Sequence, residues 1–227
     1  MQCQYCKGTC QKAGKQKNGA QKHFCKACNR YQQSTYRNRA WEAGTNQMIC
    51  NLVCDSVGVR GIARILKINV NTVLRRIRHI ADKVAKPPIR RHQQVLEVDE
   101  LRTFIGHKAN EYWLAYALNS RTGEIVDFVV GKRTKRTLRQ LVNTLLLSDV
   151  KIIRTDKLSM YRGLIPTSTH CSQVNGTNHI ERKNLTIRTH LKRLSRRTIC
   201  FSRSLKMLQC CIKIYCWGKT SGSYNWA

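Results

Sequence analysis

Acidic residues are scarce in this chain. Its 227 residues include 12 Asp and Glu against 42 Lys and Arg, which gives a formal net charge of +30. No acid precedes Glu42 and none follows Glu181. A compact protein with this charge repels itself unless a polyanion is its normal partner, so we expect nucleic acid to bind it. Charge alone leaves open a structural protein of an RNA machine, or a chain drawn to anionic membrane surfaces.

Long apolar runs are also missing. No stretch approaches the roughly 18 unbroken apolar residues that a bilayer-spanning helix requires. The first residues, MQCQYCKGTC, lack the apolar segment of a secretion signal. We therefore expect a soluble protein of the cytoplasm with no membrane partner. In such a reducing compartment, the 12 cysteines are expected to be thiols rather than a disulfide framework.

Four cysteines have the spacing of a zinc site. Cys3 and Cys6 form one C-x2-C pair, and Cys25 and Cys28 form a second. Each pair fits a tight turn, and four thiolates can close a tetrahedron with no open position, which is typical of structural Zn2+. Residues 1–36 lack an apolar period, so we expect a zinc-binding module there, held by the metal. Four unrelated reduced cysteines are the alternative.

Residues 45–84 are predicted to form an all-helical unit of the helix-turn-helix type. Within it, residues 59–77 read as two short helices joined at a turn, and the second helix begins after an Asn, a suitable N-cap. The start of the second helix would meet base edges in DNA, through Asn71, Thr72, Arg75 and Arg76. The expected core residues of this pair of helices are Ile65, Val73 and Ile77. A helical hairpin without a DNA role remains the alternative.

A linker at residues 85–93 separates this unit from a β-rich region at 94–217, and residues 218–227 form a tail. Strands are predicted at 95–105, 112–118 and 125–130, as an antiparallel meander. A helix at 134–147 and a strand at 150–154 return to the same sheet. A short strand at 168–174, a basic helix from 177 to about 195 and a last helix at 202–216 complete the prediction. The expected fold is an α/β core built on a mixed sheet.

Three carboxylates are candidates for a site that handles phosphates with two metal ions. Asp99 lies inside the first predicted strand, Asp156 ends a later strand, and Glu181 lies on the basic helix. Side chains at these three places can meet at one point, as in ribonuclease H-like folds. Glu97 shares the face of Asp99, whereas Glu100 points to the other side. A surface ion pair on the basic helix is the alternative role for Glu181.

Several motifs together resemble one known family. They are the paired cysteines, GVRGIARILKINVNTVLRRI, EVDE, the Tyr112–Ala117 strand, TDKLSMY and HIERKNLTIRTHLKRLSRRT. This set resembles transposases of the "insertion sequence one" family, a DDE group. The resemblance implies that Asp99, Asp156 and Glu181 bind two Mg2+ or Mn2+ ions in a ribonuclease H-like catalytic domain. It also assigns a catalytic role to Arg188, two helical turns after Glu181.

The resemblance implies a bacterial, nucleoid-associated enzyme that cleaves and transfers DNA strands. Its partners would be double-stranded terminal inverted repeats and target DNA, and we expect at least a homodimer on paired ends. Phosphates would be neutralised by basic residues after Glu181, namely Arg182, Lys183, Lys192 and Arg193. Lys157 stands where the family usually has Gly. The alternatives are a non-catalytic zinc and helix-turn-helix regulator, an inactive transposase copy, or a related nuclease.

Overall fold

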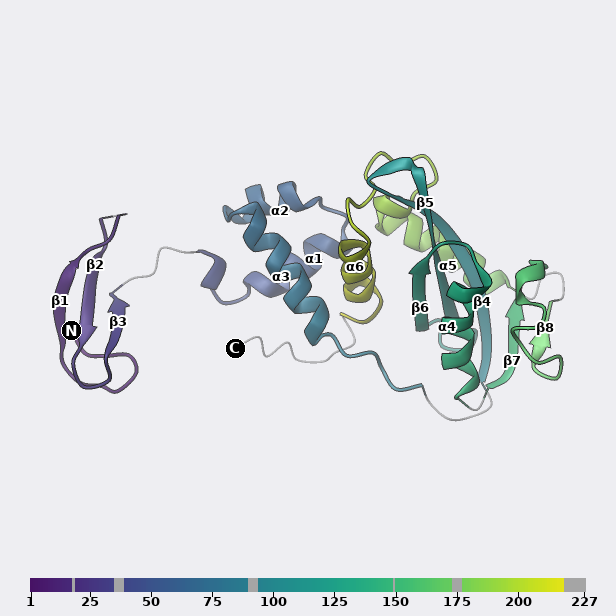
Figure 1. The fold of residues 1–227 in the computed structure, drawn as a ribbon, viewed down its shortest axis with the longest axis horizontal. Coiled ribbons are helices and arrows are strands. Elements are labelled where there is room, and N and C mark those ends of the chain that lie inside the picture. Colours follow the sequence, from purple (N-terminus) through teal and green to yellow (C-terminus); the bar gives the residue numbers. More distant parts are fainter. Residues whose placement is uncertain (18, 35–38, 90–93, 149, 173–176, 219–227) are drawn as a thin grey trace. The chain divides into compact units, whose positions relative to one another are not determined.

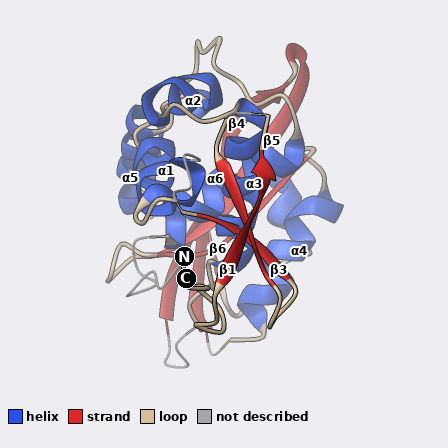
Figure 2. Cartoon of the chain, turned by 90° about the vertical axis from the view of Figure 1, so that its left-hand side faces the viewer, coloured by secondary structure: helices blue, strands red, loops and turns tan. Residues whose placement is uncertain are grey.

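The computed structural model describes residues 1–17, 19–34, 39–89, 94–148, 150–172 and 177–218. The chain divides into two compact units, Met1–Glu42 and Ala43–Ala227, whose elements are traced in Figure 1 and separated into helices and strands in Figure 2. Residues 90–93 of the expected linker and 219–227 of the expected tail lie outside the described ranges. None of the helices within those ranges has the length and apolar character needed to cross a membrane.

The first unit is a small antiparallel sheet. Its strands are β1 (Cys10–Lys15), β2 (Gln21–Cys25) and β3 (Arg30–Gln33), in the order β1-β2-β3, followed by a short 3-10 helix, η1 (Arg39–Trp41). These strands were not predicted, because they are short and mostly polar. Among the described residues of this unit, the Phe24 and Tyr31 rings lie 4.8 Å apart across β2 and β3, and the buried cluster consists of cysteines. A sheet with so little core needs another source of stability, which agrees with a metal-held module.

Three helices begin the second unit: α1 (Thr45–Cys54), α2 (Val59–Leu66) and α3 (Val70–Lys83). The predicted Asn cap of α3 is confirmed, because the Asn69 side chain accepts a hydrogen bond from the Asn71 N–H at 2.8 Å. Lys67, with φ 52°, makes the left-handed turn between α2 and α3. α3 packs against α1 and α2 through a buried face that includes Val73 and Ile77, as expected.

Ile65 was wrongly placed in this core. Its side chain is 55% exposed, and Ile62 and Ala63 are the buried residues of α2. At about 100° per residue, the buried face of α2 is centred between Ile62 and Ala63, and Ile65 lies roughly 110° away around the helix axis. The sequence shows that α2 is amphipathic, but the packing angle against α3 decides which apolar residue is left outside.

A five-stranded mixed sheet forms the rest of the second unit, as predicted. Its strands run in the order β6-β5-β4-β7-β8, antiparallel from β6 to β4 and parallel from β4 to β8. The bounds are β4 (Gln94–Ile105), β5 (His107–Asn119), β6 (Ile125–Gly131), β7 (Val150–Thr155) and β8 (His170–Cys171). Helix α4 (Lys135–Leu146) connects β6 to β7, and the 3-10 helix η2 (Ser159–Tyr161) follows β7.

Two layers of helices cover this sheet. Leu96 and Val98 of β4 pack with α4 on one face, and Leu101 on the other face packs with α5 (Asn178–His190) and α6 (Leu205–Trp217). Figure 1 shows α4 and α5 on opposite sides of the strands. The basic helix was expected to reach about residue 195, but α5 ends at His190 and a 3-10 helix, η3 (Lys192–Leu194), follows.

Helix α6 also packs against α1 and α3, so residues 43–227 form one compact unit. The division into a helix-turn-helix domain at 45–84 and a catalytic domain at 94–217 remains a prediction based on function, because both segments belong to one compact unit.

Candidate active site and metal centre

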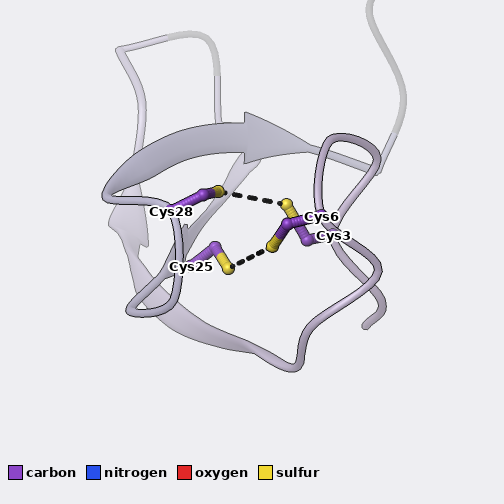
Figure 3. A group of neighbouring side chains, drawn as sticks. All are labelled: Cys3, Cys6, Cys25 and Cys28. Carbon is purple, nitrogen blue, oxygen red and sulfur yellow. Dashed lines mark hydrogen bonds between the residues drawn. The ribbon is translucent and has the colours of Figure 1, made fainter.

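The four predicted zinc ligands come together in the first unit. Sγ of Cys3 lies 3.6 Å from Sγ of Cys28, and Sγ of Cys6 lies 3.5 Å from Sγ of Cys25 (Figure 3). All four sulfurs lie within 4.8 Å of one another. A tetrahedron with Zn–S bonds of about 2.3 Å separates its sulfurs by roughly 3.8 Å, so the cluster fits Zn2+.

Backbone hydrogen bonds lower the pKa of two of the four thiols, Cys3 and Cys25, whereas burial raises the pKa of Cys28. Despite a backbone hydrogen bond at Gly8, the Cys25 thiol raises the pKa of Cys6. Backbone hydrogen bonding, first from Cys6 and then from Tyr5, lowers the pKa of the Cys3 thiol to about 6, although burial opposes the shift. Metal binding requires such deprotonated sulfur. Cys10 is a buried neighbour of the cluster, and burial raises its pKa. Its Sγ accepts a hydrogen bond from Gln32 Nε2 at 3.0 Å, and it is not among the four gathered sulfurs.

Asp99 lies in the middle of β4, on the face covered by α5. Each of its oxygens accepts one hydrogen bond: Oδ1 from the Glu100 N–H at 2.7 Å and Oδ2 from Asn184 Nδ2 at 2.6 Å. Burial raises the pKa of Asp99, these two hydrogen bonds oppose the shift, and the charges of Asp156 and Glu181 raise it further. The charges of Asp156 and Glu181 are therefore close enough to act on Asp99.

Asp156 reaches this place through the parallel pairing of β4 with β7. Val98 pairs with Thr155, the last residue of β7, so Asp156 follows one position further along, beside Asp99. Asp156 is exposed, and its Oδ1 accepts a hydrogen bond from the Leu158 N–H at 3.0 Å.

Glu181 and Arg188 project from α5 into a shared cleft of about 600 Å³. Glu181 is exposed and accepts a hydrogen bond from the Thr177 hydroxyl at 3.1 Å. Burial and the nearby Arg196 lower the pKa of Arg188, whereas the charge of Asp99 opposes the shift. The lining of the cleft combines acidic, basic and neutral residues: Asp99, Glu100, Glu181, Asn184, Leu185, Arg188 and Arg196.

Three residues that hold this cleft together were missed as site residues. Glu97 is fully buried, and its carboxylate accepts hydrogen bonds from the Ile180 N–H and from His179 Nδ1, each at 2.8 Å, at the start of α5. Tyr116, the β5 partner of Asp99, donates to Asn184 Oδ1 at 2.7 Å. The available signal was polarity within predicted strands, because Glu97 lies on the same face of β4 as Asp99, and Tyr116 carries a hydroxyl on a largely apolar face of β5.

Glu100 faces the opposite side of β4 from Glu97, as expected. Its Oε1 accepts a hydrogen bond from the Tyr161 hydroxyl, and its Oε2 lies 3.1 Å from Arg133 Nη2. Burial of the Glu100 carboxyl raises its pKa. These contacts attach η2, the segment just after Asp156, to the central strand.

The predicted DNA-contacting residues differ in exposure. Asn71, Arg75, Arg182 and Lys192 are exposed, and Thr72, Arg76 and Lys183 are half-buried. Arg76 Nη1 donates to Asn46 Oδ1 of α1 at 3.3 Å. Arg193 is only 9% exposed, and its Nη1 donates to the Ser202 hydroxyl at 2.8 Å. The Arg193 side chain is therefore bound inside the protein, to the Ser202 hydroxyl, and is a poor candidate for contact with DNA.

The donor set of the cleft suits a hard divalent cation. Carboxylate oxygens are the ligands that Mg2+ and Mn2+ prefer, and each Asp99 oxygen keeps a lone pair beyond its one hydrogen bond. Within the described ranges, only the four cysteines bring all their ligand atoms within 4.8 Å of one another. The carboxylates are thus neighbours but less tightly gathered than the thiols.

Comparisons with known proteins agree with this arrangement. A family model described as IS1 transposase matches residues 94–220, and one described as InsA C-terminal domain matches residues 35–80. The chain is 40% identical over 113 residues to the insertion element iso-IS1n protein InsB of Shigella dysenteriae, a match that covers 50% of this chain and 86% of that protein. It is 37% identical over 111 residues to the insertion element IS1 protein InsB of Shigella sonnei, covering 49% and 85%.

One solved structure, a simian T-cell lymphotropic virus intasome in complex with the PP2A regulatory subunit B56 gamma, has a TM-score of 0.36 at 15% identity. The match covers 64% of this chain and 59% of that one. The IS1 transposase model, by contrast, spans more than half of the sequence. The chain therefore belongs to the IS1 transposase family.

Proposed function

We propose that this chain cleaves DNA at the ends of an insertion element and joins those ends to target DNA, in a catalytic domain of the ribonuclease H-like type. The observation that carries the proposal is the proximity of Asp99 to the two other carboxylates: Asp99 and Glu181 line one cleft, and Asp156 follows the β7 residue that pairs with Val98, next to Asp99. The negative charges of Asp156 and Glu181 act on Asp99, and a regulator that only bound DNA would have no use for this repulsion. Bound cations would relieve this repulsion.

Two Mg2+ or Mn2+ ions held by these three carboxylates would activate the attacking oxygen and stabilise the departing one. The chain's own contribution is positioning and charge. The Glu100 N–H and Asn184 orient Asp99, and Arg188 and Arg196 place positive charge in the same cleft. Guanidinium groups bind phosphate oxygens with two donors at once, so they would hold the strand that is cut.

The α2 and α3 helices would recognise the terminal inverted repeats. The first two turns of α3 expose Asn71 and Arg75, where a helix-turn-helix meets the major groove. Arg182, Lys183 and Lys192 would contact phosphates beside the cleft. The first unit would be held by structural Zn2+ at its four thiolates. Because two ends must be brought together, at least two copies would assemble on DNA, and a complex of one chain on paired ends would contradict this.

The test is strand transfer of a labelled, precut terminal repeat into plasmid DNA with Mg2+ or Mn2+. We expect joined product from the wild type and about a thousandfold less or none from Asp156→Asn and Glu181→Gln, because each loses an anionic metal ligand. Glu124→Gln, which changes an exposed acid in the turn before β6, is the matched control and should join DNA normally. Equal joining by all four proteins would refute the assignment of the site.

A second outcome would identify the regulator. If the wild type binds the repeat tightly and yields no joined product at any metal concentration, the DNA-binding function stands without catalysis. Lys157 is exposed directly after Asp156, so Lys157→Gly is then the informative variant. Product restored by this change would show a copy inactivated at that position, and continued absence of product would favour the regulator.

A further inference from the structure

The buried face of α5, which covers Asp99, contains one polar residue. The buried residues of α5 are Ile180, Asn184 and Ile187, and Asn184 is 7% exposed. A buried amide costs free energy unless both of its ends are hydrogen-bonded. Both ends of Asn184 are used: Oδ1 accepts from the Tyr116 hydroxyl at 2.7 Å, and Nδ2 donates to Asp99 Oδ2 at 2.6 Å.

We propose that Asn184 is a positioning residue that fixes the carboxylate of Asp99 for metal binding, and that Tyr116 fixes the orientation of the Asn184 amide. The inference rests on the proposed function, because it concerns the same cleft. It adds two residues that would never touch DNA or the reacting atoms but would set the affinity of the site for its cation.

With Asp99 ionised, the hydrogen-bonding groups of the three residues favour one orientation of the Asn184 amide, and the Tyr116 hydroxyl also lies 3.2 Å from the Ile180 carbonyl oxygen. An amide turned by 180° would place Asn184 Oδ1 against Asp99 Oδ2, two acceptors at 2.6 Å with no hydrogen between them. Tyr116 reinforces the observed orientation because a phenol hydroxyl donates to the amide oxygen. Burial raises the pKa of Tyr116, so this hydroxyl keeps its proton at neutral pH. Tyr116 is 1% exposed and pairs with Asp99 across β4 and β5, so it has little freedom to move.

The consequence for Asp99 is a carboxylate held at both oxygens. The Glu100 N–H occupies one lone pair of Oδ1, and Asn184 occupies one lone pair of Oδ2. The carboxylate plane can then no longer rotate freely, and one lone pair on each oxygen remains for a cation in the cleft that Asp99 lines. Groups that orient a metal ligand in this way typically change metal affinity 10- to 100-fold when removed.

Asn184 also ties α5 to the central strand between the two other residues of the proposed site. Glu181 lies three positions before it and Arg188 four positions after it, so all three share one side of the helix. The hydrogen bond from Asn184, the middle residue of the three, to Asp99 sets the position of α5 along β4. Glu181 and Arg188 are thereby placed over the same carboxylate.

The experiment measures Mn2+ binding to zinc-loaded, DNA-free protein by the electron paramagnetic resonance signal of free Mn2+, together with strand transfer as a function of Mn2+ concentration. Asn184→Ala should weaken Mn2+ binding about 10- to 100-fold and shift half-maximal joining to correspondingly higher Mn2+. Tyr116→Phe should give a smaller shift in the same direction. Thr189→Ala removes a hydroxyl of α5 that bonds only to its own helix, and should match the wild type.

Variants that fold poorly do not spoil the test. Asn184→Leu keeps the branched shape and the number of heavy atoms of the side chain, and the Tyr116 hydroxyl still has the Ile180 carbonyl at 3.2 Å as an acceptor. This variant is therefore expected to fold and to show the same loss of Mn2+ affinity as Asn184→Ala. A purely structural role would lower melting temperature and leave the Mn2+ dependence unchanged, and that result in Asn184→Leu would overturn the proposal. Failure of the proposed function itself looks different, because the wild type would then neither bind Mn2+ at the cleft nor join DNA.

Discussion

Replacing Glu97 with alanine tests how firmly the sheet holds the helix that carries Glu181. The bond from the buried Ile180 N–H to the Glu97 carboxylate, at 2.8 Å, has a charged acceptor and should contribute about 1.5–3 kcal/mol. A negative charge at the first turn of α5 should add about 0.3–1 kcal/mol. The His179 side chain is 64% exposed, so solvent screens its pairing with Glu97 and limits it to about 0.5 kcal/mol. We expect the free energy of unfolding to fall by roughly 3 kcal/mol.

Calorimetry of the larger unit is the assay. A change of this size should lower the melting temperature by roughly 6–12 °C in a unit of this length. Glu97→Gln should lose about half as much, because its amide oxygen can still accept from the Ile180 N–H. Glu124→Ala, an exposed acid in a turn, should stay within about 0.5 kcal/mol of the wild type. If Glu97→Ala melts within about 2 °C of the wild type, the carboxylate does not hold α5 and the reasoning fails.

Three other predictions concern the metal centre, the DNA interface and the charge of the site. Cys25→Ser should abolish stoichiometric zinc and unfold the first unit, as elemental analysis and protease sensitivity would show, whereas Cys10→Ser should keep one zinc per chain. Arg75→Ala should weaken binding to the terminal repeat and lower the slope of log affinity against log salt by about one; an unchanged slope would remove Arg75 from the interface. Burial and neighbouring charges raise the pKa of Asp99. Without divalent cation, the Asp99 carboxyl therefore binds a proton more tightly in the native state than in the unfolded chain. The stability that this proton contributes is lost as pH rises through the raised pKa. Glu181→Gln should lower the pKa of Asp99 and reduce that loss, which carboxyl titration by NMR and melting at several pH values can check.

Periodicity and turn residues were enough to predict the mixed sheet. The strand predicted from Val95 to Ile105 corresponds to β4, and the turn signal at Gly106 lies between the end of β4 and the start of β5. The cap at Asn69 was equally readable, because a side-chain acceptor before an apolar period is a local feature. The paired cysteines were predictable for the same reason, since spacing within a turn fixes which sulfurs can meet.

Contacts between distant segments were not readable from the same patterns. Asn184 meets Tyr116 and Asp99 only because β4, β5 and α5 pack together, and nothing near Asn184 in the sequence marks it as buried. The end of α5 at His190 was missed because the apolar period continues through Leu191 and Leu194. Both side chains are buried, but the residues that follow α5 form the 3-10 helix η3 instead of continuing the α-helix. Periodicity reports which side chains are buried, and it does not report how the backbone brings them inside.

The two faces of α6 explain why the helical pair and the sheet form one unit. Cys210 and Ile214 are buried among α1, α2 and α3, whereas Leu208 and Ile212 are buried against the sheet and α5. These pairs lie on opposite sides of the helix, because two residues correspond to about 200° of rotation. Because α6 is apolar on both sides, removing either the helices α1 to α3 or the sheet would expose a large apolar surface. The helix pair proposed to read the repeat is therefore held at a fixed distance from the cleft proposed to cut it, which is the geometry that cleavage at a set position from a recognised sequence demands.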